Sequence, residues 1–200
     1  MTVLRTARLL MREWKDDDVD PIARMVEDPR VGKYLSKFRN RAAVQAWIEA
    51  EREQFRRKGY GLFAVERSDP PEFVGFCGLT DVDYEAHFTP AVEIGWRLQP
   101  DCWGHGYASE AAAAVLDFGF EALKLNEIVA NSSVDNLASR IVMERIGMSH
   151  DPKDDFDHPL KAPDDVLRRQ VLYRITLQDW HRRRQAQLAP SSPVFGNAGG

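Results

Sequence analysis

The stretch that decides the fold is RLQPDCWGHGYASEAAAAVLDFGF, from Arg97 to Phe120. Gly104 and Gly106 stand one residue apart, just before an alanine-rich run that predicts a helix over 109–124. Glycines before a helix let the backbone approach a ligand, and the free N–H groups of the first turn attract anions. The stretch therefore predicts either a plain turn or a phosphate-binding loop, and the rest of the chain has to decide between them.

Two common nucleotide motifs do not fit this loop. The Rossmann pattern G-x-G-x-x-G requires a third glycine where Ser109 stands, and a P-loop requires Gly-Lys-Ser/Thr, which does not follow. The helix after the loop does carry a stripe of small residues at helical spacing, formed by Ala108, Ala112, Val115 and Gly119. This stripe lets the helix lie close to a sheet and aim its N-terminus at the loop.

Composition argues against two classes of partner. The 27 Lys and Arg residues against 31 Asp and Glu leave a formal charge of −4, which predicts no nucleic-acid partner and no membrane binding. No apolar run approaches the about 20 residues of a membrane span, and the N-terminus has no signal-peptide pattern. Cys77 and Cys102 have no metal-ligand spacing and are expected to be buried thiols. We therefore expect a cytoplasmic protein.

Hydrophobic periodicity places the remaining elements. We expect one domain over 1–184 with a disordered tail over 185–200. The element order is βααβββαβαβ, which is an α/β (α+β) fold. The elements are a strand at 8–14, a short helix around Ile22, a helix at 41–57 capped by Asn40, strands at 60–67, 73–83 and 91–99, the helix at 109–124, a strand at 127–134, a helix at 137–146 and a strand at 168–180. The polar segment 149–166 is a long excursion of open role.

The segment WGHGYASEA resembles the acyl-CoA loop of the GNAT superfamily of N-acetyltransferases. The family pattern Q/R-x-x-G-x-G/A falls on Trp103, Gly104, His105, Gly106, Tyr107 and Ala108. Tryptophan at the first position departs from the pattern and is typical of a subgroup similar to the ribosomal-protein N-terminal acetyltransferases, RimJ and RimL. The strand AVEIGWRLQ, the block NSSVDNLASRIVMERIGM and the end VLYRITLQDW resemble further family blocks in family order. The resemblance covers residues 8–180.

The resemblance implies a mixed sheet splayed in its middle, with helices on both faces. It also implies acetyl-CoA as co-substrate, with no metal. The loop from Trp103 to Ala108 would hold the pyrophosphate, with His105 contributing a backbone N–H. Backbone N–H groups of Trp96, Arg97 and Leu98 would hold the thioester oxygen and the pantetheine chain. Asn136 would cap its helix and touch the cofactor.

Glu93 is the candidate general base for deprotonating an amine. It precedes the loop in AVEIGW, where Val92, Ile94, Trp96 and Leu98 alternate against it and place it on the opposite face of the strand. A base matters most for a lysine-like amine of pKa about 10.4, and less for an α-amine of pKa about 7.7–8.0. The alternative is an exposed strand carboxylate or a member of an ion pair.

Ser139 is the candidate proton donor for the leaving thiolate. Many family members carry a tyrosine in this block, but Met143 stands at the equivalent position here. Ser139 follows Asn136 by three residues and is the substitute, or else a simple first-turn residue; Tyr173 is a further candidate. The alternative to catalysis is therefore a non-catalytic acyl-CoA-binding or regulatory module, and the third possibility is a purely structural protein.

The acceptor is expected to be a primary amine, either a small molecule or a protein N-terminus, used by a monomer or homodimer. His158 with Asp154, Asp155 and Asp157 has no recognised metal-ligand spacing. We interpret this acidic segment instead as lining the acceptor side, where it would favour a cationic amine.

Overall fold

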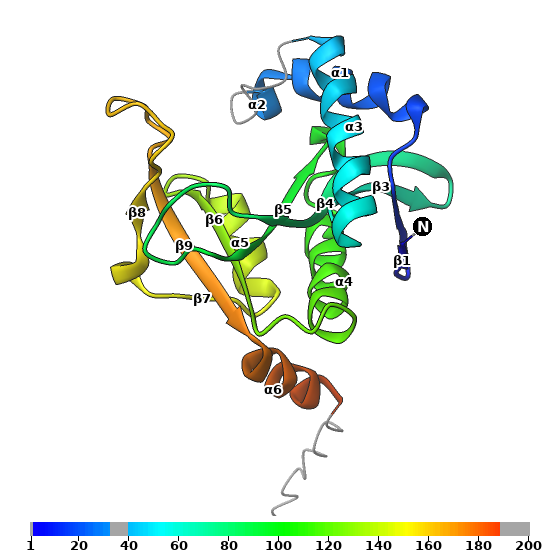
Figure 1. The fold of residues 1–200 in the computed structure, drawn as a ribbon. Coiled ribbons are helices and arrows are strands. Elements are labelled where there is room, and N and C mark those ends of the chain that lie inside the picture. The colour runs from blue at the N-terminus through cyan, green and yellow to red at the C-terminus, as the bar shows by residue number, and fades with distance from the viewer. Residues whose placement is uncertain (1, 33–39, 189–200) are drawn as a thin grey trace, which may run out of the picture.

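A computed structural model describes residues 2–32 and 40–188 of the 200-residue chain. Most of the predicted tail, from residue 189 onward, lies outside this part. Figure 1 shows a twisted sheet that divides into two arms, with helices packed on it. Within the described residues, no helix is both long and apolar enough to cross a membrane.

The sheet follows the order β1-β2-β3-β4-β5-β6-β9-β7, and β8 also pairs with β9. The first arm is antiparallel and consists of β1 (Val3–Arg5), β2 (Leu9–Arg12), β3 (Leu62–Ser68), β4 (Pro71–Asp81) and β5 (Val92–Leu98). The second arm consists of β6 (Glu127–Ser133), β7 (Ser149–His150), β8 (Phe156–Asp157) and β9 (Arg169–Thr176). Both arms are antiparallel internally.

Within the sheet, one registered pair of residues joins the two arms. β5 and β6 run parallel and share a single registered pair, Glu93 with Val129. By contrast, β4 stays in register with β5 from Gly75–Leu98 to Asp81–Val92. Beyond Glu93 the strands β5 and β6 separate, as Figure 1 shows. The central splay that the family resemblance implied is confirmed.

Helices cover both faces of the sheet. They are α1 (Val19–Glu27), α2 (Pro29–Gly32), α3 (Arg41–Lys58), α4 (Tyr107–Glu121), α5 (Leu137–Arg145) and α6 (Leu177–Leu188), with short 3-10 turns η1 (Asp16–Asp18), η2 (Pro100–Cys102) and η3 (Pro152–Asp154). On one face, Ile22 of α1 and Ile48 of α3 pack against Phe76. On the other, α4 and α5 pack against Leu79 and Ile128. The predicted mixed fold is confirmed.

Local signals set the helix starts that frame the site. The Asn40 side chain accepts a hydrogen bond from the Ala43 N–H at 2.9 Å, and the Asn136 side chain accepts from the Ser139 N–H at 3.3 Å. Gly119 shows why the small-residue stripe of α4 is needed. A Cβ atom there would lie 2.7 Å from Ile128 Cδ1 and 3.2 Å from Leu79 Cδ1, so a larger residue would force these buried side chains or the helix to shift.

Three segments differ from the sequence prediction. The last strand ends at Thr176, so residues 177–180 begin helix α6, which continues to Leu188, past the predicted domain boundary at residue 184. Thr176 Oγ1 accepts from the Asp179 N–H at 3.2 Å, a cap that starts this helix. The segment 149–166 is more ordered than expected, because β7 and β8 add two short pairings to β9.

Candidate active site

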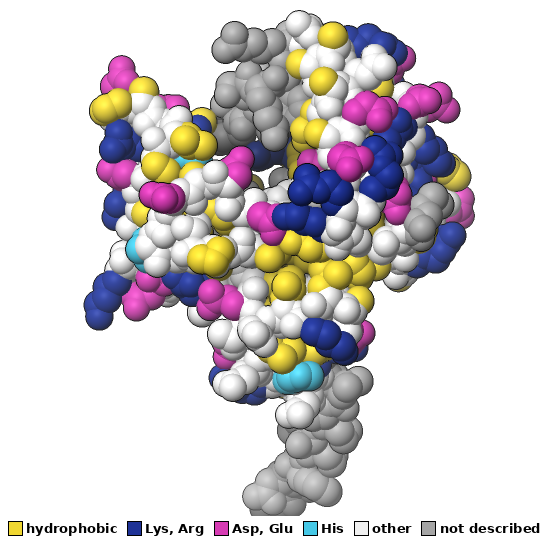
Figure 2. All heavy atoms as spheres, in the orientation of Figure 1, with side chains coloured by type: hydrophobic (Ala, Val, Ile, Leu, Met, Phe, Trp, Pro, Cys, Tyr) yellow, Lys and Arg dark blue, Asp and Glu magenta, His cyan; other side chains and the backbone are white. Residues whose placement is uncertain are grey.

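Two cavities meet where β5 and β6 separate. The Glu93 cavity, of about 260 Å³, is lined by Glu93, Thr80, Asn131 and Ser132, with the apolar side chains of Trp47, Leu62, Phe76 and Met143. The loop cavity, of about 540 Å³, lies along the glycine loop and the start of α4. Trp96, Arg97 and Ser139 line both cavities. Figure 2 shows the surface hollowed between the two arms of the molecule.

The loop cavity collects nearly all the residues predicted to bind the donor. Its lining includes Trp96, Arg97, Leu98, Trp103, Gly104, Gly106, Tyr107, Ala108 and Asn136. Gly104 and Gly106 have φ of 78° and 79°, a left-handed conformation that favours glycine. These turns bring the chain to the N-terminus of α4, whose first N–H groups have no intrahelical acceptor. The cavity thus combines an apolar channel with an anion-binding end.

His105 is the exception among the predicted loop residues. It does not line the loop cavity, and its ring stacks on Tyr107 with centroids 5.7 Å apart. Its carbonyl oxygen accepts a hydrogen bond from Arg8 Nη1 at 3.0 Å. His105 therefore contributes to the shape of the loop through its main-chain carbonyl, while its ring lies outside the cavity.

Arg8 and Glu110 also hold the loop, and neither was predicted from the sequence. Arg8 donates from Nε to Glu110 Oε2 at 2.7 Å, and its guanidinium lies over the Tyr107 ring, 4.6 Å from the centroid. Glu110 Oε1 also accepts from the Thr6 hydroxyl at 2.5 Å. Burial would raise the pKa of Glu110, but the hydrogen bonds from Thr6 and Arg8 outweigh it and hold this pKa below its usual range. The first strands of the sheet are thereby tied to the start of α4.

Glu93 lies on the face of β5 opposite the core residues Ile94 and Leu98. Its carboxylate oxygen Oε1 accepts a hydrogen bond from Asn131 Nδ2 at 2.8 Å. Burial raises the pKa of Glu93 to about 7, with Asp83 adding to the rise and the Asn131 hydrogen bonds and Arg97 opposing it. A carboxylate with this pKa can both accept and release a proton near neutral pH.

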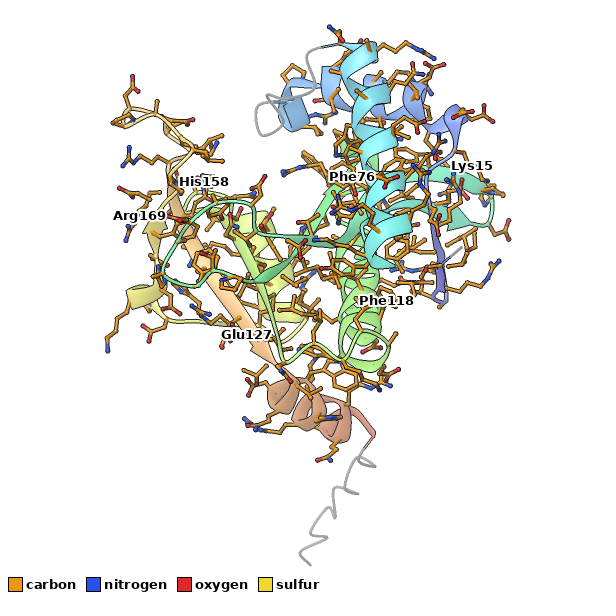
Figure 3. The ribbon with its side chains drawn as sticks, in the orientation of Figure 1. Lys15, Phe76, Phe118, Glu127, His158 and Arg169 are labelled. Atoms are coloured by element: carbon orange, nitrogen blue, oxygen red, sulfur yellow. The ribbon has the colours of Figure 1, made fainter. Side chains whose placement is uncertain are left out.

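An aromatic cluster around Tyr84 is connected to Glu93 through Asn131. Asn131 Nδ2 also donates to the Tyr84 hydroxyl at 3.2 Å. The Tyr84 ring packs on Phe156 and His158, with centroids 6.2 Å and 4.4 Å away. Burial and the nearby Glu93 raise the pKa of Tyr84. Figure 3 shows His158 on this arm and Phe76 on the other, on opposite sides of the gap.

Ser139 is well placed for a role in both cavities. It lies in the first turn of α5 and belongs to the lining of each. Met143 is buried one turn further along and lines the Glu93 cavity with its thioether side chain. Tyr173 lines neither cavity, and its hydroxyl donates to Glu144 Oε1 at 3.0 Å. Of the two hydroxyl candidates, only Ser139 stands beside the site.

The acidic segment does not face the acceptor side as predicted. Asp154 accepts from Arg174 Nε at 2.7 Å, and Asp155 lies 2.7 Å from His150 Nε2. Asp157 pairs with Arg168 and Arg169, each at 3.4 Å. These carboxylates are engaged within the second arm, so the interpretation of a cation-attracting wall is wrong. Nowhere in the described residues do three His, Cys, Asp or Glu side chains gather in a way that could hold a metal ion.

The chain matches a family model described as an acetyltransferase (GNAT) domain over residues 8–149. It is 34% identical to the uncharacterized protein YkkB of Bacillus subtilis over 152 residues, which covers 74% of this chain and 86% of that protein. A GNAT-family acetyltransferase from Bacillus anthracis superposes with a TM-score of 0.73 at 25% identity, covering 88% and 99% of the two chains. RimJ of Mycobacterium smegmatis, solved with CoA-disulfide, shares the fold with a TM-score of 0.71 at 21% identity, covering 93% of each chain.

Proposed function

The chain belongs to the acetyltransferase (GNAT) family, and from this we propose that it transfers the acetyl group of acetyl-CoA to a primary amine with Glu93 as general base. GNAT acetyltransferases use acetyl-CoA. The observation that carries the proposal is Glu93 itself, a carboxyl group with a pKa of about 7 in a cavity that adjoins the glycine loop. Membership of the family indicates the type of reaction, and the Glu93 carboxylate would accept the proton that the amine releases.

The loop cavity would hold the donor. We assign the pyrophosphate to the N–H groups at Gly104, Gly106 and the start of α4, with Asn136 further along the same cavity. The thioester would lie beside Trp96, Arg97 and Leu98, where β5 has left β6. Acceptor and thioester then meet at the wall that the two cavities share. No metal is part of this proposal.

The reaction is a direct attack without a covalent enzyme intermediate. The amine nitrogen forms the C–N bond at the thioester carbonyl carbon, and its proton passes to Glu93, directly or through one water. The C–S bond breaks, and the thiolate of CoA takes a proton from the Ser139 hydroxyl or from water. Glu93 then returns its proton to solvent, and Ser139, where it is the donor, regains a proton from solvent, so that atoms and charges balance over one turnover.

The pKa of Glu93 favours a weakly basic acceptor. Proton transfer to a group of pKa about 7 from a lysine-like ammonium of pKa about 10.4 is uphill by about 3.4 units, or about 4.6 kcal/mol. From an α-ammonium of pKa about 7.7–8.0 it is uphill by about 1 unit, or about 1.4 kcal/mol. We therefore propose a protein N-terminus or a small amine of similar basicity as the acceptor.

We place this reaction in the cytoplasm. Both cysteines are free thiols, which fits a reducing compartment. Residues of this chain line the two cavities, and we propose that they are sufficient for the reaction. The protein can act as a monomer or as each half of a homodimer.

A matched pair of peptides tests the proposal. One peptide has a free N-terminus and an acetylated lysine side chain, and the other has the same sequence with an acetylated N-terminus and a free lysine. We expect faster thiol release from acetyl-CoA with the free N-terminus at pH 7. Equal rates for both peptides would contradict the acceptor class, and no turnover with these or with small amines would contradict the enzyme assignment.

Met143 favours one alternative, a non-catalytic acyl-CoA-binding module. Its thioether side chain stands where many relatives of this family would have a hydroxyl, and it cannot donate a proton to the thiolate. This alternative predicts CoA binding in calorimetry with no thiol release from any amine. Turnover that Glu93→Gln abolishes would exclude it.

A further inference from the structure

We propose that Asn131 and Tyr84 are positioning residues that orient the Glu93 carboxylate and keep it charged for catalysis. The inference rests on the proposed function, because it gives these two residues their role through Glu93. Tyr84 lies outside the motifs that identify the family in this sequence, and Asn131 is the first residue of the block NSSVDNLASRIVMERIGM, in which the sequence pointed to Asn136, Ser139 and Met143 instead. Both come from the splayed region, where the two arms face each other.

The amide of Asn131 has two contacts that fix its orientation. Asn131 lies on β6, two residues beyond Val129, the residue that pairs with Glu93. Its Nδ2 donates to Glu93 Oε1 at 2.8 Å and to the Tyr84 hydroxyl at 3.2 Å. A carboxylate only accepts hydrogen bonds, so the NH₂ side of the amide must face Glu93. Tyr84 accepts the second N–H, so the amide is held at both of its Nδ2 contacts.

Tyr84 is held in turn by the second arm. Its ring packs on Phe156 and His158 of the 149–166 segment and on Phe88 at 6.4 Å between centroids. Beneath this cluster, Val129 and Leu172 close the packing against the sheet. The 149–166 segment therefore supports the Glu93 carboxylate indirectly. It packs on Tyr84, and Tyr84 in turn accepts a hydrogen bond from Asn131, which donates to Glu93.

The hydrogen bond decides which carboxylate oxygen is available. Both Asn131 contacts are made to Oε1, so we expect Oε2, which Asn131 does not contact, to take the amine proton. The charged groups that bear on Glu93 are Asp83, which raises its pKa, and Arg97, which lowers it, while burial raises it most. An N–H donor stabilises the ionised form of a carboxyl group. Asn131 therefore offsets part of the burial effect and extends the active pH range downward.

The test is the pH–rate profile of Asn131→Leu, which keeps side-chain volume and removes the side-chain donor, while the Asn131 main-chain N–H stays 3.5 Å from Glu93 Oε1. We expect the acidic limb to move up by about one pH unit, so that activity well below the midpoint falls about tenfold relative to the plateau. Tyr84→Phe should move it in the same direction by less. The control is Tyr60→Phe, which also removes a hydroxyl bonded to a carboxylate, Asp81 at 2.7 Å, but lies outside both cavities. Its profile should match that of the wild type.

A carbon-13 NMR titration of the Glu93 carboxyl separates this inference from the proposed function. The signal is assigned by its loss in Glu93→Gln, and no turnover is needed. The Glu93 midpoint should rise in Asn131→Leu, while the affinity for CoA stays within about twofold because Asn131 lines only the Glu93 cavity. An unchanged midpoint in a folded Asn131→Leu protein overturns the positioning role. If the midpoint rises but Glu93→Gln keeps the acidic limb, the base assignment fails instead.

Discussion

Arg8 and Glu110, 102 positions apart in the chain, form a two-point contact at the start of α4. The Arg8 main-chain N–H donates to Oε1 at 3.0 Å, and Nε donates to Oε2 at 2.7 Å. Arg8 also donates to the His105 carbonyl, so one side chain joins the first strands, the helix and the glycine loop. The shape of the donor loop therefore depends on residues from both ends of the first arm.

We expect Arg8→Gln to weaken donor binding more than it weakens the fold. The Arg8 side chain is 48% exposed, and pairs of this kind contribute about 1 kcal/mol or less to stability. Loss of the contact to His105 frees the loop, and the KM for acetyl-CoA should rise about three- to tenfold, or about 0.6–1.4 kcal/mol. Arg41→Gln, which breaks the exposed pair with Asp20, is the control and should leave this KM unchanged.

Glu93→Gln should remove the acidic limb of the pH–rate profile. The base works only when deprotonated, so the wild-type rate should rise with pH and level off above the Glu93 pKa of about 7. The variant should lose most activity at pH 7.5 and less at pH 9, where more of the amine is already neutral. Equal losses at all pH values would contradict the role of Glu93 as a base.

The same substitution has a predicted effect on stability. Because the pKa of Glu93 is raised in the folded state, that state binds more protons than the unfolded state between about pH 4.3 and pH 7. Wild-type stability should therefore fall as pH rises through this window. Glu93→Gln should be more stable than the wild type at pH 8, by up to about 3.7 kcal/mol, and show little difference at pH 4. Urea unfolding at the two pH values measures this.

Ser139→Ala should lower kcat about tenfold where chemistry limits the rate, because water replaces the hydroxyl as proton donor less efficiently. The Asn136 cap uses the Ser139 main-chain N–H, so α5 should keep its stability. Ser149→Ala, which removes an exposed hydroxyl near the Arg174 carbonyl, is the control. An unchanged kcat in Ser139→Ala would show that water alone protonates the thiolate.

Gly104→Ala and Gly59→Ala form a matched pair for the donor loop. Both glycines have left-handed φ, 78° and 75°, and a Cβ atom at either would have no neighbour within 4 Å. Each substitution should therefore cost about 1–2 kcal/mol from backbone strain alone. Only Gly104→Ala should also reduce the thermal stabilisation produced by CoA, because Gly59 caps α3 away from the loop cavity. An equal reduction in both would contradict the loop assignment.

The sequence predicted the parts of the fold that depend on neighbours along the chain. Asn40 and Asn136 cap helices through residues three positions later, so their signals are local. The start of α6 had a local signal too, since Thr176 and Asp179 have the spacing of a helix cap, but the apolar run before it favoured extending the strand. Alternation along β5 was enough to place Glu93 opposite Ile94.

The contacts of Asn131 and Tyr84, which support the site, could not be predicted from local sequence patterns. Asn131 meets Glu93 only because β5 and β6 pair at one position, and Tyr84 meets Asn131 only because segments near 84 and 156 pack together. No periodicity within either segment encodes these contacts. The same reason explains the wrong interpretation of Asp154, Asp155 and Asp157, whose cationic partners lie at distant positions such as Arg174.

The single pair between β5 and β6 also has a dynamic consequence. Strand amides protected by a neighbouring strand exchange their hydrogens slowly, whereas those without one open at low free energy. Within the described residues, the edge of β5 beyond Glu93 has no strand beside it on the β6 side. We therefore expect amides of β5 beyond Glu93 that face the gap to exchange fast and to become protected when the donor fills the gap. Bound acetyl-CoA would then protect β5 amides that no neighbouring strand protects.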